Sequence, residues 1–301
     1  MAGKINKKKT VSYDKYGYYF VLPFIIAFLL FQLYPIVYTI NLSFTGLAGW
    51  DTTYEYIKLD NYTYLLNNKL FWNSLKNTVI IWSMNFIPQI GVALLLAAWF
   101  TSVKIKVRGK GLYKVLFYFP GIITAASVAI LFRALENYPT GPINSILLNL
   151  GILSQPFEFL QSKMAARASV AFMQFWMYYG STMIMLIAGI LAIDTSLYEA
   201  AMIDGANDKV IFRKITLPLI KPIMLYVLVT SLIGGFQIFD IPFLFTGGGP
   251  DNSIQTIAMY IYYQAFTSGR NFGIASAAAV ILLIIIALLS ACIFKFLQED
   301  K

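Results

Sequence analysis

Few residues in this 301-residue chain could do chemistry, since it has no His and a single Cys, Cys292. Without His it lacks the residue that most often acts as general base and metal ligand. One Cys cannot form an internal disulfide or a Cys-cluster zinc site. Asp240 is the only acidic residue well inside an apolar segment. The residue types therefore argue against a hydrolytic, redox or metal-dependent enzyme, including an intramembrane one.

Polar residues recur at helical spacing inside two apolar segments. In the segment 168–193, Gln174, Met177, Tyr178 and Ser181 follow at i, i+3, i+4 and i+7, which places them on one helix face. The segment 222–245 carries Ser231, Gly234, Gly235, Gln237 and Asp240. Polar groups are costly at membrane depth and commonly mark a functional site. Helix–helix hydrogen bonding is the alternative for Gln174, Tyr178 and Gln237.

Composition indicates that lipid is the main solvent of these segments. Apolar residues make up 58% of the chain and charged residues 12%, against roughly 45–50% and 25% in soluble domains. A helix needs about 20 apolar residues to cross a bilayer. The sequence predicts an all-α membrane protein with six transmembrane helices, at 18–43, 75–100, 115–135, 168–193, 222–245 and 272–296. The first apolar run is too long for a cleaved signal core of about 7–15 residues.

The distribution of positive charge predicts the orientation. With the N-terminus inside the cell, the inner segments and the last helix end hold sixteen of the 23 Lys and Arg residues, and the outer loops hold five. Positive residues accumulate on the cytoplasmic side, so both termini are expected to be cytoplasmic. This bias also explains the net charge of +9. Contact with membrane lipid is expected, and nucleic-acid binding is not, because the basic runs are short and lack interleaved aromatic residues.

The inner loop 194–221 predicts two short helices. Ser196 and Glu199 have the spacing of a capping box, and Gly205 can supply the left-handed residue that ends the first helix. Asn207 can cap a second helix, which Pro218 is expected to stop. From these residues alone, a structural hairpin and a docking surface are equally supported.

The same loop carries a family resemblance. The pattern E-A-A-x-x-D-G-A-x5-F-x2-I-x-L-P-x3-P resembles the EAA loop of the membrane subunits of bacterial ABC importers, and more narrowly that of the maltose-type carbohydrate permeases. Further similarities are Thr246-Gly-Gly-Gly-Pro250 and Leu70-Phe-Trp-x-Ser-Leu-x-Asn77. The loop residues matched are Glu199, Ala200, Ala201, Asp204, Gly205, Ala206, Phe212, Ile215, Leu217, Pro218 and Pro222.

The resemblance implies a permease subunit with the type I importer fold in the bacterial cytoplasmic membrane. Its function would be to move a sugar or oligosaccharide across that membrane by alternating access. Glu199, Ala200, Ala201, Asp204, Gly205 and Ala206 would then couple the chain to an ATPase. In related permeases the fourth and fifth spans supply the sugar pocket. This implies a substrate pathway lined by Gln174, Met177, Tyr178, Ser181, Ser231, Gly235, Gln237 and Asp240.

The implied partners are a second, related permease, two cytoplasmic ATPase subunits and an extracytoplasmic sugar-binding protein. The chain lacks a G-x4-G-K-[ST] phosphate loop. No cofactor is therefore expected on this chain, and ATP with Mg would bind the ATPase subunits. The expected divisions are a tail at 1–17, the first span with its outer loop at 18–74, a permease core at 75–296 that contains the coupling loop 194–221, and a tail at 297–301.

Several alternatives stay open from the residues. Asp240 could accept a hydrogen bond from a sugar hydroxyl, pair with Arg133 or a cation of the partner, or carry protons in an ion-coupled secondary transporter or channel. Arg133 and Glu136, three apart on a helix, are expected to pair with each other. Asn85 and Gln89, which flank Pro88, are interpreted as packing or kink groups.

Overall fold

The computed structural model describes residues 14–50, 53–102, 108–267 and 269–298, and these residues are helical apart from loops and two isolated β-bridges. The expected tails at 1–17 and 297–301 lie largely outside the described residues. The elements are α1 (Asp14–Phe28), η1 (Leu29–Leu33), α2 (Tyr34–Leu42), α3 (Asp60–Asn67), α4 (Lys69–Thr101), α5 (Lys110–Tyr118), η2 (Phe119–Ile122), α6 (Ala125–Leu135), α7 (Pro142–Asn149), α8 (Lys163–Leu191), α9 (Thr195–Ile203), α10 (Asp208–Ile211), η3 (Phe212–Thr216), α11 (Leu217–Leu219), α12 (Lys221–Phe236), α13 (Asp240–Thr246), α14 (Ile257–Phe266) and α15 (Phe272–Gln298).

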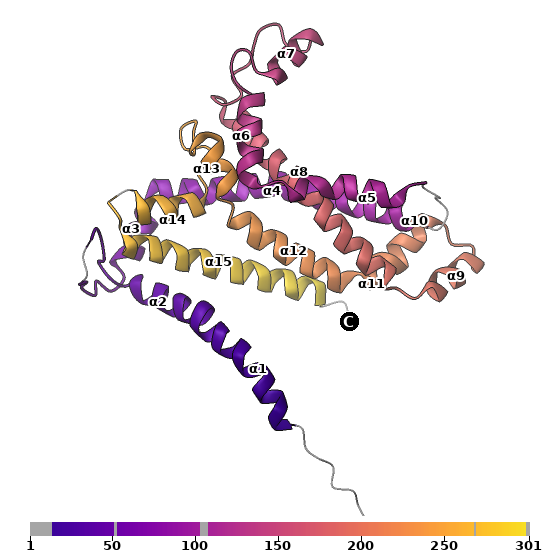
Figure 1. Cartoon of the computed structure of the whole chain (residues 1–301), viewed down its shortest axis with the longest axis horizontal. Helices are drawn as coiled ribbons and strands as arrows, with labels where there is room; N and C mark the ends of the chain where they lie inside the picture. The colour runs from indigo at the N-terminus through magenta and orange to yellow at the C-terminus, as the bar shows by residue number, and fades with distance from the viewer. Residues whose placement is uncertain (1–13, 51–52, 103–107, 268, 299–301) are drawn as a thin grey trace, which may run out of the picture.

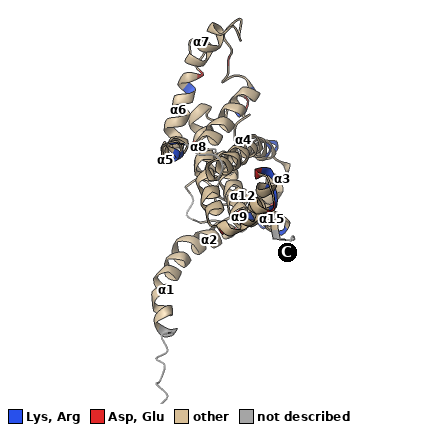
Figure 2. Cartoon of the chain, turned by 90° about the vertical axis from the view of Figure 1, so that its right-hand side faces the viewer, with Lys and Arg blue, Asp and Glu red and all other residues tan. Residues whose placement is uncertain are grey.

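A bundle of long apolar helices forms the centre of the molecule. In Figure 1, α4, α8, α12 and α15 run in roughly the same direction, with α3 and α14 at one end and α9 at the other. Figure 2 views the bundle from the α9 end, and most of the ribbon there is neither acidic nor basic. Within the described residues, five helices are long and apolar enough to cross a membrane, or six if one bent pair counts as a span. The expected all-α membrane fold is confirmed.

The expected third span is not one straight helix. The segments 110–122 and 125–135 meet at 88°. Pro120 lies in a 3-10 turn, and the Thr124 side chain caps the next helix by accepting a hydrogen bond from the Ser127 N–H. The 3-10 turn with Pro120 thus ends one helix, the cap at Thr124 starts the next, and the chain turns between them. Apolar composition does not report such a break.

The first span leaves the bundle. The segment Tyr16–Leu42 has none of its apolar window buried within the chain, and Figure 1 shows α1 pointing away from the other helices. A π-helical turn at Leu29–Leu33 separates α1 from α2, and the Tyr34 N–H donates to the Leu29 carbonyl. Pro35 follows directly and has no N–H to donate, which fits this shift in the hydrogen-bond pattern.

Close contact between helices depends on glycine at particular positions. A Cβ on Gly180 of α8 would collide with the backbone carbonyl of Phe117 in α5. A Cβ on Gly235 of α12 would collide with the indole of Trp82 in α4. Gly235 thus allows the fifth span to approach α4 closely. The same span unwinds between α12 and α13, over residues 237–239.

Candidate functional site

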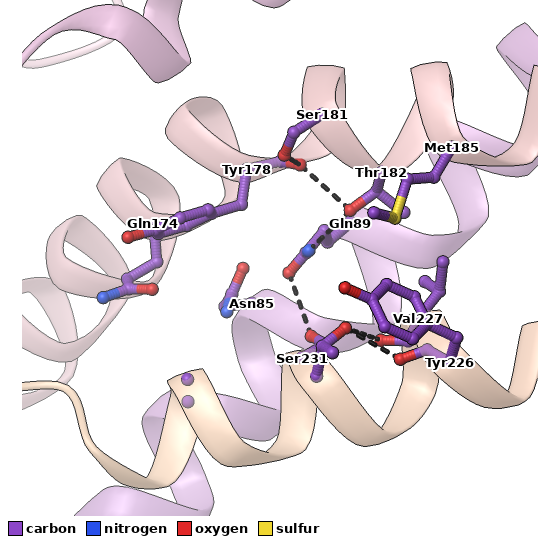
Figure 3. Close-up of a pocket in the computed structure, with 13 residues that line it drawn as sticks. Asn85, Gln89, Gln174, Tyr178, Ser181, Thr182, Met185, Tyr226, Val227 and Ser231 are labelled. Atoms are coloured by element: carbon purple, nitrogen blue, oxygen red, sulfur yellow. Dashed lines mark hydrogen bonds between the residues drawn. The ribbon is translucent and has the colours of Figure 1, made fainter. Parts of the chain in front are cut away.

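A cavity of about 320 Å³ lies between α4, α8 and α12 (Figure 3). Ligand cavities in proteins commonly measure about 300–1,000 Å³, so this one suits a small solute or one unit of a larger one. Each of the three helices contributes polar side chains to its wall. The lining residues are Asn85, Gln89, Gln174, Tyr178, Ser181, Thr182, Met185, Tyr226, Val227, Thr230, Ser231, Gly234 and Gly235.

One part of the cavity wall is fixed by hydrogen bonds across the three helices. The Gln89 Nε2 group of α4 donates to Thr182 Oγ1 of α8 at 2.9 Å, and Ser231 Oγ of α12 donates to Gln89 Oε1 at 3.4 Å. Thr182 Oγ1 in turn donates to the Tyr178 carbonyl at 3.0 Å. Both ends of the Gln89 amide are thus engaged. This side chain holds the helices in register.

A second part of the wall carries two amide side chains that are largely buried. Asn85 is 3% exposed and Gln174 is 7% exposed. Neither side chain makes a hydrogen bond to a described residue, and Asn85 Oδ1 is among the buried atoms that lack a partner. In Figure 3 the Asn85 amide points into the cavity. Because a buried polar atom without a partner is costly, Asn85 Oδ1 requires an explanation beyond packing.

The structure brings together only some of the residues expected along a substrate pathway. Gln174, Tyr178, Ser181, Ser231 and Gly235 line the cavity. Met177 is instead buried in the apolar core between α4, α6, α8 and α13. Gln237 lies in a separate groove between α2, α12 and α15. Asp240 is exposed at the first residue of α13 and does not line the cavity.

Several cavity residues lie outside the expected set, namely Asn85, Gln89, Thr182, Tyr226 and Thr230. Asn85 and Gln89 are four residues apart on α4, the spacing that places two side chains on one helix face. This polar pair inside an apolar span could have revealed that α4 contributes to the site. Pro88 between them led instead to the interpretation as packing or kink groups.

One expected charge pairing, and one that was left open as an alternative for Asp240, are absent from the described residues. Arg133 is exposed and forms no ion pair with Glu136 or Asp240. The expected pairing of Arg133 with Glu136 is therefore wrong. Glu136 is 5% exposed at the end of α6, and both of its carboxylate oxygens accept a hydrogen bond from Ser169 Oγ of α8 at 2.8 Å. Glu136 follows the last helical residue, so it turns inward instead of lying over Arg133.

The inner loop forms two short helices, but the cap of the first one differs from expectation. Asp194, not Ser196, caps α9, because its carboxylate accepts a hydrogen bond from the Ser196 N–H at 2.9 Å. This hydrogen bond lowers the pKa of the Asp194 carboxyl below its ordinary value. Glu199 then lies too far along the helix to complete a capping box. The competing Asp two residues earlier explains the error.

The end of α9 and the start of α10 agree with the sequence. Gly205 has a φ of 79°, and the Ala206 N–H donates to the Ala201 carbonyl at 2.9 Å, as in a Schellman motif. Asn207 caps α10 by accepting a hydrogen bond from the Val210 N–H. Pro218 does not stop the helical run, because it lies in the first turn of α11, where its missing N–H is tolerated.

One face of α9 is exposed although part of it is apolar. Ile203 is 87% exposed and Leu197 is 45% exposed, and Glu199 and Ala200 lie on the surface as well. The opposite face is held to the bundle, since Tyr198 and Thr216 hydroxyls are 3.2 Å apart. An exposed apolar patch on a positioned helix is typical of a surface that contacts another protein.

A hydrogen-bonded clamp holds the loop 247–256 at the opposite end of the bundle. Arg167 of α8 donates from Nη2 to Asn77 Oδ1 at 2.7 Å and from Nε to the Ser253 carbonyl at 3.0 Å. Asn77 of α4 donates to the carbonyls of Asn252 and Gln255. The Thr256 hydroxyl donates to the Ile238 carbonyl at 2.7 Å. The clamp therefore links this loop to the unwound residues 237–239.

Comparison with known proteins places these features in context. Residues 67–300 match the family described as the binding-protein-dependent transport system inner membrane component. The chain is 33% identical to the lactose transport system permease protein LacF of Rhizobium radiobacter, over 96% of each chain. It is also 33% identical to the arabinooligosaccharides transport system permease protein AraP of Bacillus subtilis, over 100% of this chain and 95% of that one.

Solved structures share the fold. A bacterial ABC transporter involved in the import of the acidic polysaccharide alginate contains a chain that matches with a TM-score of 0.78 and 24% identity, over 97% of this chain and 98% of that one. A chain of the MetNI methionine ABC transporter matches with a TM-score of 0.53 and 18% identity, over 80% of this chain and 98% of that one.

Proposed function

This chain belongs to the family of binding-protein-dependent transport system inner membrane components, and we propose that it is the permease subunit of an ATP-driven importer of sugars or oligosaccharides. Lactose and arabinooligosaccharides are named for two relatives that align over nearly the whole chain. The amide and hydroxyl groups of the cavity suit a solute rich in hydroxyl groups. This polar cavity inside an apolar bundle is the observation that carries the proposal.

The chain spans the cytoplasmic membrane several times, with both termini and the loop 194–221 inside the cell. The excess of Lys and Arg in the inner segments supports this orientation. The first span with its outer loop, 18–74, precedes a permease core at 75–296. An extracytoplasmic sugar-binding protein delivers the solute to the outer loops 46–74 and 246–271.

The chain shares the substrate pathway with a second, related permease. The cavity is small for an oligosaccharide, and α1 and α2 leave apolar surface uncovered. A second permease would complete the wall of the pathway and cover part of that surface. Gln174, Tyr178, Ser181, Ser231 and Gly235 line this chain's share of the pathway, and Met177, Gln237 and Asp240 stay candidates for its continuation.

Energy for transport comes from two cytoplasmic ATPase subunits that bind ATP and Mg. The residues Glu199, Ala200, Ala201, Asp204, Gly205 and Ala206 couple the permease to them, with α9 as the docking helix. Its exposed face with Ile203 supports this role. Movement of α9 is transmitted to the bundle, which alternates between inward-facing and outward-facing states. Reversing a 1:99 population takes about 5.5 kcal/mol of differential binding, a demand that ATP and a docked partner can meet.

Substitutions at the coupling loop test this function. Glu199→Lys reverses a charge on the exposed face of α9, and Gly205→Asp places a side chain on a residue with a φ of 79°, where L residues are strained. Both variants are expected to lower ATP-driven uptake at least tenfold while the assembly still binds its solute. Lys209→Ala, on the surface of the same loop, is the control. Full uptake by both variants would contradict the coupling role.

A further inference from the structure

We infer that this chain's share of the cavity wall favours neutral carbohydrate over anionic solutes, and that Asn85 binds the solute directly. The inference rests on the proposed function and specifies the substrate class of that same cavity. The relatives make the question concrete, because their names include lactose and arabinooligosaccharides but also sn-glycerol-3-phosphate. A solved structure with the same fold comes from an importer of an acidic polysaccharide.

The preference for neutral solutes follows from the absence of charged residues in this chain's cavity wall. All thirteen lining residues lie in the described part of the chain, and none of them is Asp, Glu, Lys or Arg. An isolated carboxylate or phosphate is strongly penalised when it leaves water without a cationic partner. The acidic Asp240 lies outside this wall, so this chain contributes neither a positive nor a negative charge to it. A neutral polyol loses much less hydration and can regain it from amides and hydroxyls.

The role of Asn85 follows from which amides of the cavity wall already have hydrogen-bond partners. Gln89 uses both ends of its amide in hydrogen bonds to Thr182 and Ser231, so this side chain is already satisfied. Asn85 lies one turn away on the same helix, is 3% exposed, and its Oδ1 atom is buried without a hydrogen-bond partner. An amide that offers one acceptor and two donors matches a sugar hydroxyl, which both donates and accepts.

Gln174 and Tyr178 complete the binding surface from α8. Gln174 is a second buried amide without a hydrogen bond to a described residue. Tyr178 is 45% exposed and lines the same cavity, so its ring is available to lie against the apolar face of a pyranose. Asn85, Gln174 and Tyr178 thus form the ligand-binding part of the wall, and Gln89, Thr182 and Ser231 form the part that positions it.

Equilibrium binding to the whole membrane assembly, purified with its partner permease and ATPase subunits and without the binding protein, tests both halves. The probes are lactose and arabinotriose as neutral solutes, with an alginate trimer and sn-glycerol 3-phosphate as anionic ones. At least one neutral probe is expected to bind the wild-type assembly, and the anionic probes at least tenfold more weakly. Asn85→Ala should weaken binding of the neutral probe about tenfold, the loss of roughly one hydrogen bond.

Asn73→Ala is the matched control, because Asn73 is an exposed Asn of the same helix, and it should leave the affinity unchanged. Thermal denaturation of each assembly separates loss of binding from loss of folding. Equal or tighter binding of an anionic probe would overturn the charge selectivity. Wild-type affinity in Asn85→Ala would overturn the role of Asn85. If no probe binds, the inference fails, while ATP-driven uptake of another solute by the same assembly would still support the proposed function.

Discussion

At the scale of single residues, the neighbouring glycines of α12 have different roles. Gly235 lies against the indole of Trp82, and an added Cβ would collide with it. Gly234 also lines the cavity, but an added Cβ there would meet no atom within 4 Å. Gly235 is therefore required by packing, whereas the space beside Gly234 is open. Gly235 allows α12 to approach α4 closely enough to close the cavity between them.

Substitution of these glycines by Ala tests this assignment. Gly235→Ala is expected to destabilise the chain by about 1–3 kcal/mol, the usual cost of overpacking a core. Gly234→Ala is expected to be neutral or to stabilise by about 0.5–1 kcal/mol, because Ala favours helix over Gly. Thermal denaturation of the purified protein measures both. Equal midpoints for the two variants would show that the contact with Trp82 does not restrict α12.

At the scale of elements, two connections link the ends of the bundle to its middle. At one end, α9 contacts the bundle through Tyr198, and its other face is exposed. On the other end, Arg167 and Asn77 hold the loop 247–256, and Thr256 links that loop to the unwound residue Ile238. Residues 237–239 begin two residues after the last glycine of the cavity wall. A change at the loop 247–256 therefore has a short route to the cavity.

Removing the guanidinium of Arg167 tests the connection between α8 and the loop 247–256. Arg167→Ala deletes hydrogen bonds to the Ser253 carbonyl and to Asn77, each worth about 1.5–3 kcal/mol when the donor is charged. We expect limited proteolysis within 247–256 to be at least tenfold faster. Lys163→Ala, one turn earlier on α8, is the control, because its ion pair with Asp251 is exposed and such pairs contribute about 0–1 kcal/mol. Similar cleavage rates in both variants would argue against the clamp.

At the scale of the whole molecule, the features that sequence predicts well are those set by periodic or local chemistry. Apolar length predicts the long helices, and Gly205 and Asn207 act as expected because their roles depend on neighbouring backbone groups. The 88° turn after Pro120 escaped prediction, since apolar composition is the same on both sides of it. The link from Glu136 to Ser169 crosses 33 residues, which no local pattern reports.

In the cavity too, the sequence predicts what helical spacing determines and misses what the packing of helices determines. Helical spacing on the fourth span placed Gln174, Tyr178 and Ser181 on one face, and these three residues line the cavity. Asn85 and Thr182 escaped because their importance depends on which helices meet and on which amides stay without partners. Those facts belong to the packing of three helices. Met177 shows the converse, because its spacing matches the face while its side chain is buried in the neighbouring core.

The central claim is that this chain is the membrane part of an importer and receives its energy from a separate ATPase. Uptake of a radiolabelled neutral sugar into proteoliposomes tests it most directly, with the chain reconstituted beside its partner permease, ATPase subunits and binding protein. We predict accumulation only with ATP and with all components present. Accumulation by this chain alone, driven by an ion gradient and abolished by Asp240→Asn, would contradict the account.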